Sequence, residues 1–259
     1  MLDLRSLAVG YRSAGRALLS GMDVSAEPGA FICILGRNGA GKSTLMRTIA
    51  GLQPSLDGVA ALGGENVASM RPGTRARRIA VVLTERQFNP GLRVEDMVAL
   101  ARQPFTGWEG RLGDGDRAAI AEAVAVMGIE PFARRYFSNL SDGERQRVMI
   151  ARALAQTPRL MILDEITAFL DLPSRVEIMA LLRSQAKAKG QVVLLSSHDL
   201  DLSLQLSDSV WLLDGAGGFS VGTPEALSQS GAVGRAFDTD AIRYSPSQGR
   251  FEIRTSESA

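Results

Sequence analysis

Residues 36–44, with the sequence GRNGAGKST, constrain the fold of this chain more than any other segment. They match the pattern G-x-x-x-x-G-K-[ST], they follow the apolar run FICIL, and they precede the helix-like run TLMRTIAG. Glycines in this pattern let the backbone curl until its N–H groups face a phosphate chain, and the next helix adds its positive dipole end. The pattern predicts a strand, a phosphate-binding loop and a helix in that order. The alternative, a glycine-rich turn that binds nothing, is disfavoured by this full context.

Each part of this predicted phosphate loop has a chemical role. Lys42 supplies a point charge for the β- and γ-phosphates of a nucleotide, and the hydroxyl of Ser43 is a ligand for Mg²⁺. The expected nucleotide contacts are Gly36, Arg37, Asn38, Gly39, Ala40, Gly41, Lys42, Ser43 and Thr44.

A second candidate element is the acidic pair in LMILDE. It places Asp164 and Glu165 at the C-terminal end of an apolar strand, the edge at which open parallel sheets bind ligands. Alone, such a pair is more typical of a helix cap. Beside a phosphate loop it predicts a division of roles, in which Asp164 holds hydrated Mg²⁺ and Glu165 polarises the attacking water as general base.

Short apolar runs followed by helical periods predict an α/β fold with a parallel sheet. The runs expected to form its strands are residues 31–35, 79–83, 160–163, 192–196 and 209–213. Residues 2–9 and 17–25 alternate like antiparallel strands instead. Helical patterns dominate residues 85–158, where Ile120, Val124 and Met127 share one face.

Composition limits the class of partner. The formal net charge is +1, so no overall basic field argues for nucleic acid or anionic lipid. The single cysteine, Cys33, lies within an apolar run and is expected in a buried strand. No run of about 18 apolar residues and no signal core is present. We therefore expect a soluble chain that reaches a membrane through a partner.

Residues 140–154, LSDGERQRVMIARAL, make the fold prediction specific. Ser141 is a good N-cap, Glu144 completes an S-x-x-E capping box, and Gly143 permits close approach of a phosphate. The segment resembles the signature of the ATP-binding cassette (ABC) ATPases. In that family the signature closes over the γ-phosphate held by the opposite subunit, which implies a contact in trans from Ser141, Asp142, Gly143 and Glu144. Asp142 replaces a glycine of the commonest form.

Other positions resemble motifs of the same family. Tyr11 stands where an aromatic residue stacks on adenine, although alone it would be taken for a strand or turn residue. The segment AFLD places Asp171 in the loop that communicates between subunits. His198 resembles the histidine that reads the γ-phosphate, and it follows the apolar run VVLLSS.

Two departures from the family pattern stand out. Ile166 follows the acidic pair where proline is usual, a change expected to be tolerated. The family's glutamine, which contacts Mg²⁺ and water and senses the permease, is expected in the segment RRIAVVLTERQFNP, but Thr84 occupies its aligned position. Glu85 is the favoured replacement and Gln87 the alternative, since a carboxylate can hold Mg²⁺ through a water.

The resemblance implies a single ABC ATPase domain over residues 1–259. Its RecA-like phosphate-loop core and N-terminal antiparallel β subdomain would cover residues 1–84 and 159–223. A helical signature subdomain would cover residues 85–158, and a tail of a helix and short strands residues 224–259. ATP and Mg²⁺ are the implied cofactors, with no nucleic acid bound.

The resemblance also implies partners and a place of action. The ATPase is expected to work as a homodimer bound to integral membrane permease subunits on the cytoplasmic face of the cell (inner) membrane, and indirectly with an extracytoplasmic substrate-binding protein. Three segments together resemble the ATPases of bacterial importers for iron chelates (siderophores), haem and cobalamin: ARQPFTGWEGRL, VLTER and LDEITAFLDLPSRVEIM. The alternatives are an exporter or lipid transporter, and a soluble ABC protein outside transport. Two interpretations remain open for Arg102, Phe105 and Trp108. These side chains either line a permease-facing groove or pack the helical subdomain.

Overall fold

The central feature of the computed structural model is a six-stranded sheet. The structure describes residues 1–11, 16–83, 91–168 and 170–253. The strand order is β10-β9-β3-β8-β7-β6. The strands are β3 (Phe31–Gly36), β6 (Ile79–Val82), β7 (Leu160–Asp164), β8 (Val192–Ser196), β9 (Ser209–Leu213) and β10 (Phe219–Gly222). The five predicted apolar runs all form parallel strands, which confirms the α/β fold class, and β10 adds an antiparallel edge.

A second, antiparallel sheet contains the N-terminus. Its order is β2-β1-β4-β5. The strands are β1 (Leu2–Tyr11), β2 (Arg16–Ala26), β4 (Asp57–Leu62) and β5 (Glu65–Asn66). The pairing of β1 with β2 was expected from their alternating pattern. The other two strands had no such signal in the sequence.

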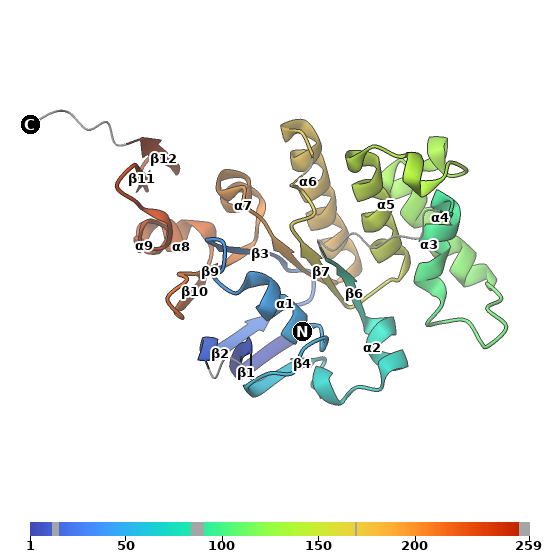
Figure 1. The fold of residues 1–259 in the computed structure, drawn as a ribbon, viewed down its shortest axis with the longest axis horizontal. Coiled ribbons are helices and arrows are strands. Elements are labelled where there is room, and N and C mark those ends of the chain that lie inside the picture. Colours follow the sequence, from blue (N-terminus) through green and yellow to red (C-terminus); the bar gives the residue numbers. More distant parts are fainter. Residues whose placement is uncertain (12–15, 84–90, 169, 254–259) are drawn as a thin grey trace, which may run out of the picture.

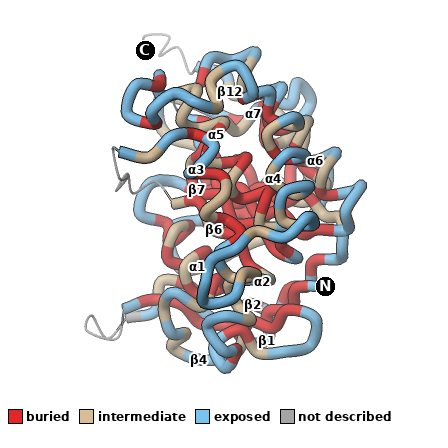
Figure 2. The backbone as a smooth tube through the Cα atoms, turned by 90° about the vertical axis from the view of Figure 1, so that its right-hand side faces the viewer, coloured by how far each residue is buried: buried red, intermediate tan, exposed pale blue. Residues whose placement is uncertain are grey.

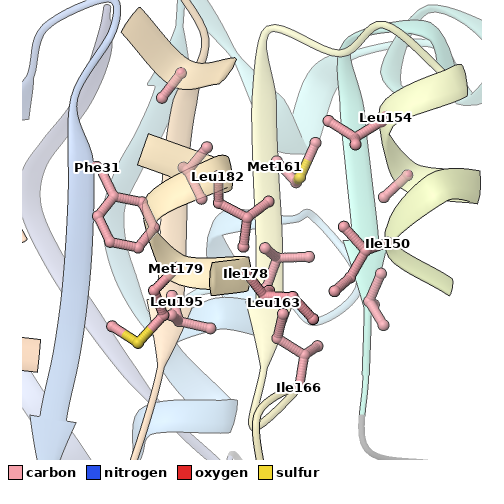
Figure 3. Packing of buried hydrophobic residues seen from close by; sticks show 14 of the residues in the cluster. Phe31, Ile150, Leu154, Met161, Leu163, Ile166, Ile178, Met179, Leu182 and Leu195 are labelled. Atoms are coloured by element: carbon pink, nitrogen blue, oxygen red, sulfur yellow. The ribbon is translucent and has the colours of Figure 1, made fainter. Parts of the chain in front are cut away.

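The central sheet separates two hydrophobic clusters, because successive side chains of a strand point to opposite faces. In β3, Phe31 and Cys33 belong to the cluster that also contains residues of α6 (Leu172–Lys189). Ile32, on the opposite face, belongs to the cluster with α1 (Lys42–Ile49) and the N-terminal sheet. Figure 3 shows side chains of α6, among them Met179, against Leu195 of β8 and its neighbours. Cys33 is fully buried, as expected.

Helices lie at one end of the molecule, at the right of Figure 1. The elements there are α3 (Val94–Ala99), α4 (Asp114–Met127) and α5 (Asp142–Ala155), with short 3-10 turns at Leu100–Arg102, Glu130–Phe132 and Phe137–Asn139. A 3-10 turn at Val67–Ser69 and α2 (Pro72–Arg78) lead from the N-terminal sheet to β6. Met127 of α4 is buried, and Ile120 and Val124 pack against the same cluster, so the predicted face of this helix is its packed face.

The C-terminal part forms a small unit beside α7 (Leu200–Leu206). It contains α8 (Pro224–Gln229), α9 (Ala232–Phe237) and a hairpin of β11 (Ile242–Ser245) and β12 (Arg250–Ile253). Inside it the ring of Phe251 contacts the rings of Phe237 and Tyr244. Figure 2 shows how buried backbone concentrates in the middle of the molecule. Within the described residues, no helix is both long and apolar enough to span a membrane.

Candidate active site

The phosphate loop connects β3 to α1 in the predicted order. Gly39 and Gly41 have positive φ values of 81° and 98°, and Gly41 is the N-cap of α1. At Gly36 a side chain has no room, since a Cβ atom would lie 2.8 Å from the carbonyl oxygen of Leu213 in β9. Glycine is therefore needed where the strand approaches its neighbour and where the loop turns into the helix.

Lys42 lies beneath this loop. Its Nζ donates to the carbonyl oxygens of Gly36, at 2.8 Å, and Arg37, at 3.4 Å, and the residue is buried. Burial lowers the pKa of Lys42, while the nearby carboxylates of Glu165 and Asp164 act in the opposite direction. The cation thus faces the two acidic residues at the adjoining strand end.

The remaining loop residues differ in exposure. Arg37 and Asn38 are exposed, Ala40 is buried, and Ser43 is half-buried in the first turn of α1. The hydroxyl of Tyr11 lies 3.2 Å from Oγ1 of Thr44, and about half of Tyr11 is exposed. Tyr11 is thus held beside the loop with its ring partly open to solvent.

The acidic pair ends β7 at the same edge of the sheet. Asp164 is buried and accepts a hydrogen bond from Oγ of Ser196, at 2.5 Å. Oγ of Ser196 in turn accepts from the backbone N–H of Glu165, at 2.9 Å. Ser196 was not singled out from the sequence. Its place as the last residue of the apolar run VVLLS was the available signal.

Glu165 and His198 are in direct contact. Oε1 of Glu165 lies 2.6 Å from Nε2 of His198, and both side chains are partly exposed. The φ of Glu165 is 54°, in the left-handed region, which costs on the order of 1–3 kcal/mol for a residue other than glycine. This backbone turn directs the carboxylate to the histidine at the end of the neighbouring strand.

The oxygen ligands at this edge fit Mg²⁺ that arrives with a nucleotide. Asp164 and Ser43 offer hard oxygen atoms, and the carboxylates of Asp164 and Glu165 lie near the ammonium of Lys42. Among the described residues, no group of three His, Cys, Asp or Glu side chains forms a metal cage. Mg²⁺ commonly binds through one or two carboxylates together with phosphates, so a protein cage is not required.

Two cavities lie on either side of His198. One, of about 460 Å³, lies between the phosphate loop and Phe237 of α9, and Gly36 and Asn38 line it. The other, of about 610 Å³, lies between Glu165 and the C-terminal hairpin. Within the described chain, none of the residues that line them belongs to the signature segment, residues 140–154.

The signature segment begins α5 with the predicted capping box. Oγ of Ser141 accepts from the N–H of Glu144, and the N–H of Ser141 donates to Oε2 of Glu144, at 2.8 Å. That backbone donor, assisted by Arg135, lowers the pKa of Glu144. Asp142 pairs with Arg145, at 3.3 Å.

Asp171 begins α6. Its Oδ1 accepts a hydrogen bond from the N–H of Ser174, at 3.1 Å, so within one chain it acts as a helix cap. Ile166, which stands in the place of the usual proline, is buried. Thr84 and Glu85, the candidate coupling residues, and the alternative Gln87 lie outside the described residues.

The structure separates the two interpretations of Arg102, Phe105 and Trp108, which were packing of the helical part or a permease-facing groove. Arg102 is buried, pairs with Asp116 at 2.8 Å and lies 3.7 Å above the ring of Phe105. Arg102 and Phe105 therefore pack within the helical part. Trp108 is 97% exposed.

A strand, a phosphate loop and a helix, with carboxylates at the adjoining strand end, define a phosphate-loop nucleoside triphosphatase. The family model described as ABC transporter matches residues 19–168. The chain belongs to the ABC transporter family and is an ABC-type ATPase.

Relatives and solved structures agree with this placement. An uncharacterized ABC transporter ATP-binding protein of Methanocaldococcus jannaschii is 38% identical over 98% of this chain and 87% of its own. The hemin import ATP-binding protein HmuV of Streptomyces coelicolor is 38% identical over 86% of this chain and 79% of its own. The structure of cbiO1 from Clostridium perfringens, part of the ABC transporter complex cbiONQ, superposes with a TM-score of 0.76 at 28% identity, covering 90% of this chain and 92% of that one.

Proposed function

We propose that this chain is the ATP-hydrolysing subunit of an importer for an iron chelate (siderophore), haem or cobalamin. The observation that carries the catalytic part is the 2.6 Å contact between Glu165 and His198 beside the phosphate loop. The cargo is supported by relatives named for the import of hemin, cobalamin and petrobactin and by one named for the transport of achromobactin.

In the proposed reaction the phosphate loop binds and orients ATP. Its N–H groups and Lys42 hold the phosphates, and Tyr11 offers its ring to the adenine. Mg²⁺ bound by Ser43 and Asp164 would neutralise charge that develops on the phosphates. Lys42 must leave the carbonyl oxygens of Gly36 and Arg37 to contact a phosphate, so the loop's own acceptors occupy it until then.

Glu165 is the proposed general base. Its carboxylate accepts a proton from the attacking water, and His198 holds that carboxylate through Nε2 and contacts the γ-phosphate. Ser196 fixes the turn because its hydroxyl joins Asp164 to the N–H of Glu165. The two carboxylates are thereby given different partners, which suits different roles.

The site is proposed to be complete only in a pair of chains. Ser141, Asp142, Gly143 and Glu144 would cover the nucleotide of the opposite copy, with Asp171 communicating between the two. Within the described residues, the two cavities beside His198 are lined by other segments than residues 140–154, which supports this arrangement. A cassette solved as a dimer, MJ0796, superposes with a TM-score of 0.72 at 25% identity over 82% of this chain and 94% of that one.

The same proposal places the pair beneath integral membrane permease subunits, on the cytoplasmic face of the cell membrane, with a substrate-binding protein on the far side. Glu85 in preference to Thr84 would couple permease movement to the metal. An exporter or lipid transporter, or a soluble ABC protein, would lack stimulation by a cargo-loaded binding protein. ATPase measured with the cognate permease in liposomes therefore distinguishes import from both alternatives.

The catalytic assignment is tested by Glu165→Gln. We expect ATP binding to remain and turnover to fall by roughly 10² to 10⁴, the usual effect of losing a general base. Glu122→Gln is a matched control, because Glu122 lies on α4 of the helical part, where it pairs with Lys189 of α6. Steady-state phosphate release is the measurement, and near-normal turnover of Glu165→Gln would remove Glu165 from this role.

A further inference from the structure

Arg175 of α6 lies beside the proposed base without taking part in its direct contacts. It lines the same cavity as Glu165 and His198, and its guanidinium connects two separate loops. Nε donates to the carbonyl oxygen of Leu170, at 2.8 Å, and Nη1 donates to Oδ2 of Asp199, at 3.3 Å. Leu170 belongs to the loop that begins with Glu165, and Asp199 follows His198 directly.

These contacts close a ring. From Glu165, backbone bonds of Ala168 to Glu165 and of Leu170 to Thr167 form the turn that ends at the Leu170 carbonyl. From there Arg175 reaches Asp199, and the neighbouring His198 returns to Glu165 at 2.6 Å. Two side-chain connections thus join the loop that begins with Glu165 to the loop of His198 and Asp199. Among the hydrogen bonds of the described residues, one is the Glu165–His198 contact and the other is made by the guanidinium of Arg175.

Asp199 is suited to receive this contact because its two oxygens have separate tasks. Oδ1 caps α7 by accepting from the N–H of Leu202, at 3.1 Å, which leaves Oδ2 for Arg175. A planar guanidinium can hold two acceptors in fixed directions, which a lysine ammonium on a flexible stem does less well. The anchor is therefore rigid at both ends.

We propose that Arg175 is a positioning residue for ATP hydrolysis, which holds the loops of Glu165 and His198 at the spacing that gives their contact. The proposal rests on the proposed role of Glu165 as general base. Arg175 does not anchor the fold, since its side chain is partly exposed and α6 packs through other residues such as Ile178, Met179 and Leu182.

The test is the kinetics of Arg175→Ala. We expect kcat to fall about tenfold, as for the loss of a charge-assisted hydrogen bond, while KM for ATP and the ATP-induced thermal shift stay within about twofold of wild type. Arg175→Lys should recover part of kcat because it can keep one contact. The matched control is Arg183→Ala, which removes another Arg–Asp pair from the same helix, with Asp208, away from the site. Its kcat should not change.

Two further variants separate positioning from general destabilisation. Asp199→Asn keeps the cap of α7 but loses the charge, so it should lower kcat and combine with Arg175→Ala less than multiplicatively. In a Glu165→Gln background, Arg175→Ala should have no further effect on turnover, because both act through the same carboxylate. If Arg175→Ala does not fold, Asp199→Asn decides alone.

The proposal is overturned if kcat of Arg175→Ala, or of Asp199→Asn, stays within about twofold of wild type. It is also overturned if Arg183→Ala lowers kcat equally, or if Arg175→Ala lowers turnover further in the Glu165→Gln background. Failure of the proposed function is distinguishable, since it would appear as normal turnover of Glu165→Gln itself.

Discussion

Lys42 is expected to exchange its partners when a nucleotide binds in the proposed complex. In the free chain its ammonium is buried against two backbone carbonyl oxygens. Because burial opposes the charged form, it lowers the pKa of Lys42. A bound phosphate chain would supply the compensating negative charge.

Lys42→Ala should therefore abolish the ATP-induced rise in melting temperature. For wild type, ATP at about 100 times its Kd adds about 2.7 kcal/mol of stability because it binds only the folded state. Differential scanning fluorimetry with and without ATP measures the effect. The exposed Lys187 gives a control variant, Lys187→Ala, that should keep the shift. An unchanged shift in Lys42→Ala would contradict the assignment of the phosphate loop.

At the residue scale, motif positions were predictable because their chemistry depends on local sequence. Gly41 and Lys42 follow from the strand–loop–helix pattern, and Ser141 with Glu144 follows from the capping-box spacing. Ser196 was not predictable in this way, because its partner Asp164 is set by the register of β7 against β8.

At the element scale, strands with continuous apolar sequence were found and weaker ones were missed. The run LMIL predicted β7. In contrast, β4, DGVAAL, begins with Asp and Gly and has two small alanines among its apolar residues, and β10, FSVG, is partly exposed with only two apolar side chains. These strands form through pairing with β1 and β9, which a local pattern does not reveal.

Arg102 connects elements of the helical part. It pairs with Asp116 of α4, and its Nη1 donates to the carbonyl oxygen of Ala155 at the end of α5. Its exposed fraction is small, and so is that of Asp116. The sequence left packing and a permease-facing groove open for this residue, and only its tertiary contacts decide for packing.

Arg102→Ala should lower the free energy of unfolding by about 2 kcal/mol, since it leaves the half-buried carboxylate of Asp116 and the carbonyl oxygen of Ala155 without this donor. Urea denaturation followed by circular dichroism measures the change. Trp108→Ala is the control and should be neutral, because Trp108 is 97% exposed. A neutral Arg102→Ala would show that the ion pair carries no stability.

At the scale of the whole molecule, Asp208 connects the start of β3 to α6. It accepts from the N–H of Phe31 at 3.1 Å and from Arg183 at 2.8 Å, with Lys187 at 3.3 Å. Burial alone would raise the pKa of Asp208, but these donors outweigh it and the pKa lies below its ordinary value. A carboxylate with a lowered folded-state pKa stabilises above its unfolded pKa, and the effect is lost as pH falls through the folded pKa.

Asp208→Asn should thus destabilise at neutral pH by about 1 kcal/mol, allowing for partial exposure of the ion pairs. The difference from wild type should shrink as pH falls below about 4, the ordinary pKa of an aspartate. Thermal unfolding of both proteins across this range measures it. A difference that is constant with pH would contradict a role for the charge.

The central claim concerns two copies. One chain carries both the phosphate loop and the signature segment, but among the described residues the signature segment does not line either of the two cavities beside His198. The Glu165→Gln variant should accumulate as an ATP-bound dimer, because it binds ATP without hydrolysing it. Ser141→Arg in the same background should weaken the pair by obstructing the signature.

Size-exclusion chromatography with light scattering, on Glu165→Gln with ATP and little Mg²⁺, tests this claim most directly. The account predicts a dimer with ATP and a monomer without it, and a monomer for Ser141→Arg with ATP bound. A Glu165→Gln chain that binds ATP and remains strictly monomeric would contradict it.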